Sequence, residues 1–101
     1  MIYSFRFTRP ALRDLLEIDT YLRKTAGNAI ADAFNDEMIA KAESLRSKPN
    51  RQRERTELMA GLRALHVNGY LIFYRVEPDF AAILRVLHVS RNITAKLFPR
   101  S

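Results

Sequence analysis

Three arginines and one histidine near the end of the chain have the types and spacing to do chemistry. Arg63, Arg85 and Arg91 lie within or just after strongly apolar segments, and His88 lies between the last two. An arginine inside a strand is costly unless its guanidinium group meets water or an anionic group. These arginines could therefore bind an acidic or phosphate-bearing partner. His88 could act as a general base beside Arg91, as ribonuclease chemistry would require.

Simpler structural roles compete with these functional ones. The arginines could instead form ion pairs with Asp14, Glu17 or Glu57, and both interpretations stay open. His88 could be a strand-end histidine whose hydrogen bonds are satisfied, which is the interpretation that we favour. Tyr74 could stack on a nucleic-acid base, although tyrosines in sheets more often pack against their neighbours.

The elements that must position these side chains are three predicted strands. Asn68-Gly69 separates the first two, and this dipeptide is the strongest short-range hairpin signal because both turn positions need positive φ. Pairing through this turn sets Arg63 opposite Tyr74, and a second turn at 77–80 sets Arg85 opposite Ile72. A slip of one residue at the second turn would move Arg85 to the other face. The predicted strands span residues 62–67, 70–76 and 81–89.

This register predicts the content of each face of the sheet. Arg63, Tyr74, Arg85 and Arg91 share one face, and His88 lies on the other. Both faces are strongly apolar, whereas an antiparallel sheet with one face in water should show one polar face. We therefore expect an uncovered, apolar and basic surface that binds another molecule. Arg63→Ala and Arg85→Ala are then expected to change partner binding more than stability.

The first half of the chain predicts one strand and two amphipathic helices. Ile2–Phe7 alternates as a half-buried strand. Thr8 offers an N-cap, and Pro10 fits the first helical turn, where its missing N–H costs nothing. Gly27 supplies a left-handed stop, and Asn28 caps the second helix. The apolar stripes are Ala11, Leu15, Ile18 and Leu22, followed by Ile30, Phe34, Met38, Ala42 and Leu45.

The element order β-α-α-β-β-β predicts a single α+β domain over residues 1–101. Its helical hairpin packs on one face of an antiparallel sheet, and residues 93–98 add a short helical turn. The connector between the helices and the sheet, residues 46–57, carries five basic side chains against two acidic ones. We favour a solvated connector over a dedicated phosphate-binding loop.

Composition limits the function classes. The 101 residues include no cysteine, which excludes disulfides and cysteine nucleophiles, and the two histidines have no metal-ligand spacing. We therefore expect no metal site and no cofactor. The chain shows no signal peptide or membrane-length apolar segment, so we expect a cytoplasmic protein. Its net charge of +6 points to an acidic or polyanionic partner.

Several segments together resemble the ParE branch of the RelE/ParE toxin superfamily. The resemblance covers essentially the whole chain in the right order, and although no single motif is decisive, the pair of segments at 70–76 and 85–88 is fairly specific. The matching segments are Ala11–Ile18 with Tyr21, Gly61-Leu-Arg63, Tyr70-Leu-Ile-Phe-Tyr-Arg-Val76 and Arg85-Val-Leu-His-Val-Ser-Arg91.

This resemblance implies a small bacterial growth-inhibiting toxin from a type II toxin–antitoxin pair. ParE-type toxins poison DNA gyrase and block replication, and a ParD-like antitoxin neutralises them by wrapping the helical hairpin and the sheet in a hetero-oligomer. By this resemblance the chain is an inhibitor of an enzyme and has no catalytic residues of its own. The candidate partner-binding residues are Arg63, Tyr74, Arg85, Arg91 and Lys96.

The RelE branch, which cuts mRNA on the ribosome, is the alternative. Arg63 and Arg91 stand where that branch keeps arginines, and with His88 they would be the catalytic residues. However, Phe98 stands near the position of a late tyrosine, and a phenyl ring can neither orient nor activate a ribose 2′-hydroxyl. The predicted register also separates His88 from Arg63 and Arg91. A third possibility is a toxin fold that acts only in a repressor complex.

Overall fold

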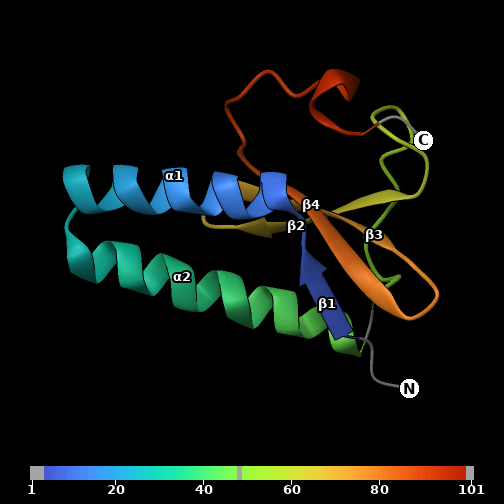
Figure 1. Cartoon of the computed structure of the whole chain (residues 1–101), viewed down its shortest axis with the longest axis horizontal. Helices are drawn as coiled ribbons and strands as arrows, with labels where there is room; N and C mark the ends of the chain where they lie inside the picture. The colour runs from blue at the N-terminus through green and yellow to red at the C-terminus, as the bar shows by residue number, and fades with distance from the viewer. Residues whose placement is uncertain (1–3, 48, 100–101) are drawn as a thin grey trace.

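The computed structural model describes residues 4–47 and 49–99, so Ile2 and Tyr3 of the predicted first strand lie outside the described residues. Two helices, α1 (Arg9–Thr25) and α2 (Asn28–Glu43), run side by side on one side of a four-stranded sheet (Figure 1). The strands are β1 (Ser4–Phe7), β2 (Leu62–Val67), β3 (Tyr70–Val76) and β4 (Phe80–His88). Short 3₁₀ turns follow α2 at Ser44–Arg46 and end the fold at Ala95–Leu97.

The sheet is mixed, and the prediction of an antiparallel sheet was wrong for one strand. Its order is β1-β4-β3-β2, and β1 runs parallel to β4. Both helices and the strands β2 and β3 separate β1 from β4 in sequence, so these two neighbours in the sheet are not joined by a direct turn. Thr8 fixes this corner, because its hydroxyl donates to the Ile83 carbonyl at 2.9 Å and also accepts from the Ala11 N–H at 3.4 Å. The predicted N-cap is therefore confirmed.

The turn between the helices is shorter than the sequence predicted. Gly27 has φ 96° and ψ 167°, a backbone conformation that suits glycine, and its N–H donates to the Leu22 carbonyl. Gly27 itself precedes α2, and Asn28 is already helical. The prediction that Asn28 is the N-cap was wrong, because a link of Ala26 and Gly27 leaves no room for another residue outside the helices.

The buried face of α2 also begins one residue later than predicted. Ala31 is fully buried, whereas Ile30 is 53% exposed. Steps of four residues from Ile30 drift by about 40° each around a helix with 3.6 residues per turn. Mixing steps of three and four keeps a stripe on one face. The observed stripe is Ala31, Phe34, Met38, Ala42 and Leu45.

Two apolar clusters cover the two faces of the sheet. On one face of the sheet, the helix side, both helices pack against strand residues such as Leu65, Ile72 and Ile83. On the far side, Leu58 and Met59 of the segment that follows the connector, together with Phe98 of the C-terminal segment, pack against the sheet. The expectation of an uncovered apolar face was therefore wrong, because these two segments cover it.

Candidate functional site

A β-bulge changes which side chains share a face of the sheet. The first hairpin has the predicted register, with Arg63 opposite Tyr74. Between β3 and β4 the register shifts at Phe73/Tyr74, so Arg85 pairs with Phe73 and Val86 takes the predicted place of Arg85 opposite Ile72. The extra residue in β4 reverses every later side chain. The predicted pairing of Arg85 with Ile72 was therefore wrong.

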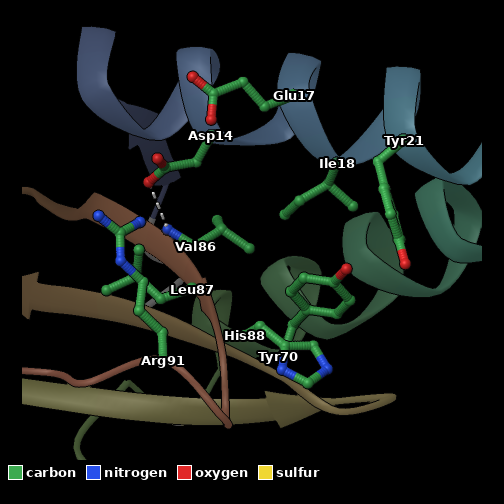
Figure 2. Close-up of a pocket in the computed structure, with 9 residues that line it drawn as sticks. All are labelled: Asp14, Glu17, Ile18, Tyr21, Tyr70, Val86, Leu87, His88 and Arg91. Atoms are coloured by element: carbon green, nitrogen blue, oxygen red, sulfur yellow. Dashed lines mark hydrogen bonds between the residues drawn. The ribbon is translucent and has the colours of Figure 1, made fainter.

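The bulge brings His88 and Arg91 to one pocket on the helix side of the sheet, which corrects the prediction that they lie on opposite faces (Figure 2). The pocket has a volume of about 200 Å³. Side chains from α1 form one wall, and the end of the β3–β4 pair forms the other. Its lining residues are Asp14, Glu17, Ile18, Tyr21, Tyr70, Val86, Leu87, His88 and Arg91.

His88 is held in a defined orientation. The Ser90 backbone N–H donates to His88 Nδ1 at 3.1 Å, and the Ser90 hydroxyl lies 2.6 Å from the same nitrogen. Because a backbone N–H can only donate, a neutral His88 carries its proton on Nε2. The ring meets Tyr70 edge-on, with centroids 5.0 Å apart. His88 is thus the hydrogen-bonded strand-end histidine that the sequence favoured, and a catalytic role for it stays a prediction.

Two tyrosines face each other across this pocket. Tyr70 is the first residue of β3, and its hydroxyl points toward Tyr21 of α1 (Figure 2). Burial, and to a lesser extent the neighbouring Tyr21, raise the pKa of Tyr70 above its ordinary value. Tyr21 is 60% exposed, so the pocket opens to solvent beside it. The pocket therefore combines aromatic rims with an apolar floor.

Arg85 takes the ion-pair role that the sequence left open. Its Nε and Nη2 donate to the two carboxylate oxygens of Asp14 at 2.7 and 2.9 Å, and its Nη1 donates to the Leu97 carbonyl at 3.0 Å. The carboxylate of Asp14 also accepts from the Val86 N–H at 3.0 Å. This hydrogen bonding raises the pKa of Arg85. Of the two roles left open for Arg85, the structure shows the ion pair with Asp14, and partner binding by Arg85 stays a prediction.

Arg63 and Tyr74 hold the connector at the opposite end of the sheet. The guanidinium of Arg63 donates to the carbonyls of Asn50 and Gln52, and the Tyr74 hydroxyl donates to the Pro49 carbonyl at 2.9 Å. Burial raises the pKa of Tyr74 to about 12. Along β3, the partner of Arg63 and the partner of His88 are four residues apart, which is about 13 Å.

Arg91 and Lys96 are exposed, and neither has an ion pair within residues 4–47 and 49–99. Arg91 also lines a polar hollow of about 310 Å³ together with Arg13 and Glu17. In the part of the chain that the structure describes, no cluster of side chains could hold a metal ion. No helix described there is long and apolar enough to cross a membrane.

Comparisons with known proteins agree with this fold. A family model described as the ParE toxin of the type II toxin–antitoxin system parDE matches residues 5–93. The chain belongs to the ParE toxin family. It is 29% identical over 90 residues to Toxin ParE3 of Caulobacter vibrioides, covering 89% of this chain and 90% of that protein.

Two solved structures share the fold of this ParE-family chain. The chromosomal ParDE system from P. aeruginosa matches with a TM-score of 0.76 and 23% identity, covering 88% of this chain and 98% of the other. The toxin–antitoxin complex RelBE2 from Mycobacterium tuberculosis matches with a TM-score of 0.58 and 26% identity, covering 87% and 99%. The α+β fold of the RelE/ParE superfamily is thereby confirmed.

In this ParE-family chain, the residues that a RelE-like ribonuclease would need are not all brought together. His88 and Arg91 share a pocket, but Arg63 lies at the other end of the sheet and holds backbone carbonyls. Phe98 is 6% exposed and packs edge-on against Phe73 with centroids 5.0 Å apart. Position 98 therefore faces the far-side core.

The sequence held a signal for Asp14 as the buried anchor of Arg85. It lies three residues after Ala11 and four before Ile18, on the stripe that faces the sheet. A carboxylate on a buried helix face is expected to have a cationic partner. Glu17 and Tyr21 follow at the next turns on the same side, and neither was predicted as a pocket residue.

Proposed function

We propose that this ParE-family chain blocks replication by inhibiting DNA gyrase, and that a ParD-like antitoxin neutralises it in a hetero-oligomer. The ParE family match supports the toxin role, and the ParDE relative supports the antitoxin. The observation that carries the choice of target is the position of Arg63, which is engaged with the connector about 13 Å along β3 from the His88 pocket. A nuclease would need these groups around one phosphate.

The test compares the purified chain alone with the same chain bound to its antitoxin. We expect the chain to inhibit supercoiling by gyrase and to increase cleaved DNA, and addition of the antitoxin to restore supercoiling. Induction in cells should cause filamentation and a DNA-damage response before protein synthesis falls. Normal supercoiling together with a rapid stop of translation would refute the gyrase proposal.

The second candidate function, ribosome-dependent mRNA cleavage, is favoured by one specific observation. His88 and Arg91 line the same pocket with Glu17, so an imidazole, a guanidinium and a carboxyl group lie together. Mapping mRNA ends after induction would detect cutting. If this candidate holds, His88→Ala and Arg91→Ala abolish the new ends, whereas Val89→Ala, an exposed neighbour between them, leaves them unchanged.

The antitoxin requires a surface, and we propose the groove on both sides of Tyr70. One side is the His88 pocket, and the other is a hollow of about 180 Å³ lined by Phe34 and Ile30 among others. Tyr21 and Ile30 are more than half exposed at the two rims. Apolar pockets with aromatic rims are suited to anchor side chains of a partner. The net charge of +6 favours an acidic antitoxin segment.

A further inference from the structure

Residues 49–54 of the connector between α2 and β2 are fixed in place through their backbone. Three of its carbonyls, from Pro49, Asn50 and Gln52, accept hydrogen bonds from Tyr74 and Arg63 of the sheet. Just beyond them, Glu54 forms a β-bridge with Arg63, and its carboxylate lies 3.4 Å from the same guanidinium. A segment held this way at successive residues has little freedom left to reorient.

This anchoring leaves two arginines directed to solvent. Gln52 is half-buried, whereas Arg51 and Arg53 on either side of it are exposed. Within residues 4–47 and 49–99, neither arginine has an ion pair or a hydrogen bond from its side chain. The next basic residue, Arg55, differs because its Nε donates to Glu57 at 2.7 Å. The connector therefore holds two exposed guanidinium groups without a direct ion pair, although the pKa of Glu57 is lowered by its hydrogen bond from Arg55 and, to a smaller extent, by the charge of Arg53.

The chemistry around these arginines selects the class of partner. Residues 49–57 contain no aromatic side chain on which bases of a single strand could stack. The first apolar side chains after them, Leu58 and Met59, are buried and cannot anchor a protein partner. Two exposed guanidinium groups without an aromatic or apolar anchor beside them suit contact with phosphate groups, which arginine binds well.

We propose that the connector binds the phosphate backbone of duplex DNA through Arg51 and Arg53. The contact is independent of sequence, because no group on the connector is placed to read base edges. Binding to DNA goes beyond inhibition of gyrase, and it can hold or fail without changing that proposal. In a gyrase complex it would add a second point of attachment, to the DNA.

The test measures affinity for a fluorescent 20-base-pair duplex by anisotropy between 50 and 200 mM salt, using the wild-type chain and Arg51→Ala/Arg53→Ala. We expect the double variant to bind roughly tenfold more weakly. The slope of log affinity against log salt should fall by about 1.8, because each lost phosphate contact removes about 0.9. The double variant should melt close to the wild-type temperature, since these side chains have no hydrogen bond or ion pair to lose.

The matched control is Arg9→Ala/Lys24→Ala, which removes two exposed charges from α1 and leaves the connector intact. This control should keep most of the wild-type affinity and slope. Equal losses in the two double variants would overturn the proposal, because net charge alone would then explain binding. Absence of measurable DNA binding by the wild-type chain, or tighter binding to single-stranded RNA of equal length, would also overturn it. Supercoiling measured on the same variants reports separately on gyrase inhibition.

Discussion

The ion pair of Asp14 and Arg85 joins three parts of the molecule through hydrogen bonds. Asp14 lies on α1, accepts two bonds from Arg85 of β4 and one from the Val86 N–H, and is 7% exposed. Arg85 in turn donates to the Leu97 carbonyl of the C-terminal segment. Removal of one partner of a buried ion pair leaves an uncompensated charge, which costs more than the pair contributes.

We therefore expect Asp14→Ala to lower the free energy of unfolding by about 3–5 kcal/mol. Urea or thermal unfolding of the purified chain measures this loss. The matched control is Glu17→Ala, an exposed carboxylate one turn later, which should change stability by less than about 0.5 kcal/mol. Arg85→Ala should also lower the free energy of unfolding, whereas the sequence alone led us to expect a larger effect on partner binding than on stability. An Asp14→Ala variant as stable as wild type would contradict the structural role of this pair.

The raised pKa of Tyr74 predicts that the folded chain loses stability at high pH. This pKa is raised to about 12 in the folded chain, against about 10 when unfolded. The unfolded chain therefore loses this proton first, so the contribution of Tyr74 is complete below pH 10 and declines as the pH rises toward 12. Within this window the free energy of unfolding should fall by about 1.4 kcal/mol per pH unit from this group.

Urea unfolding between pH 9 and 11 measures this decline, and Tyr74→Phe isolates it. The phenylalanine variant loses the hydrogen bond to Pro49, about 1 kcal/mol at neutral pH, but it has no hydroxyl to titrate. The difference in stability between wild type and variant should therefore shrink above pH 10. A constant difference across this range would show that Tyr74 ionises normally in the folded chain.

At the scale of elements, the C-terminal segment acts as a cover for the far side of the sheet. Phe98 is 6% exposed and contacts Phe73, which is fully buried. We expect Phe98→Ala to cost about 3–5 kcal/mol, because it opens a cavity and exposes the cluster beneath. Lys96→Ala, an exposed change in the same 3₁₀ turn, should leave unfolding unchanged. Equal stability of both variants would mean that the segment does not cover the sheet in solution.

Local signals in the sequence predicted the elements well but not the register of the last strand. Asn68-Gly69 determined the first hairpin because its turn geometry is local, and φ is positive at both residues as expected. The bulge at Phe73/Tyr74 has no comparable signal. It follows from the packing of Val86 toward the helices and of Leu87 toward the far-side cluster. One extra residue was enough to reverse the predicted side of His88.

The same distinction explains why the anchoring of the connector was not predicted. Residues 46–57 look like a solvated connector because their side chains are polar, and the contacts that fix them are backbone carbonyls. Backbone acceptors are identical in every sequence and carry no signal of their own. The donors Arg63 and Tyr74 were identified, but their targets required the folded chain.

For the whole molecule, the groove beside Tyr70 and the connector are two separate surfaces. The groove lies where β3 begins, and Arg63 holds the connector near the other end of β3. An antitoxin in the groove would therefore leave Arg51 and Arg53 open. Antitoxin binding and DNA contact can then be separated by mutation.

Tyr21→Ala gives the test of the groove. An aromatic rim residue that is 60% exposed contributes little to folding but much to an interface, so we expect antitoxin affinity to fall roughly 30-fold, or about 2 kcal/mol, with an unchanged melting temperature. Calorimetric titration of each toxin variant with the purified antitoxin measures both the affinity and the stoichiometry. Asp79→Ala, in the exposed turn between β3 and β4, is the control and should bind as wild type does. Wild-type affinity for Tyr21→Ala would place the antitoxin on another surface.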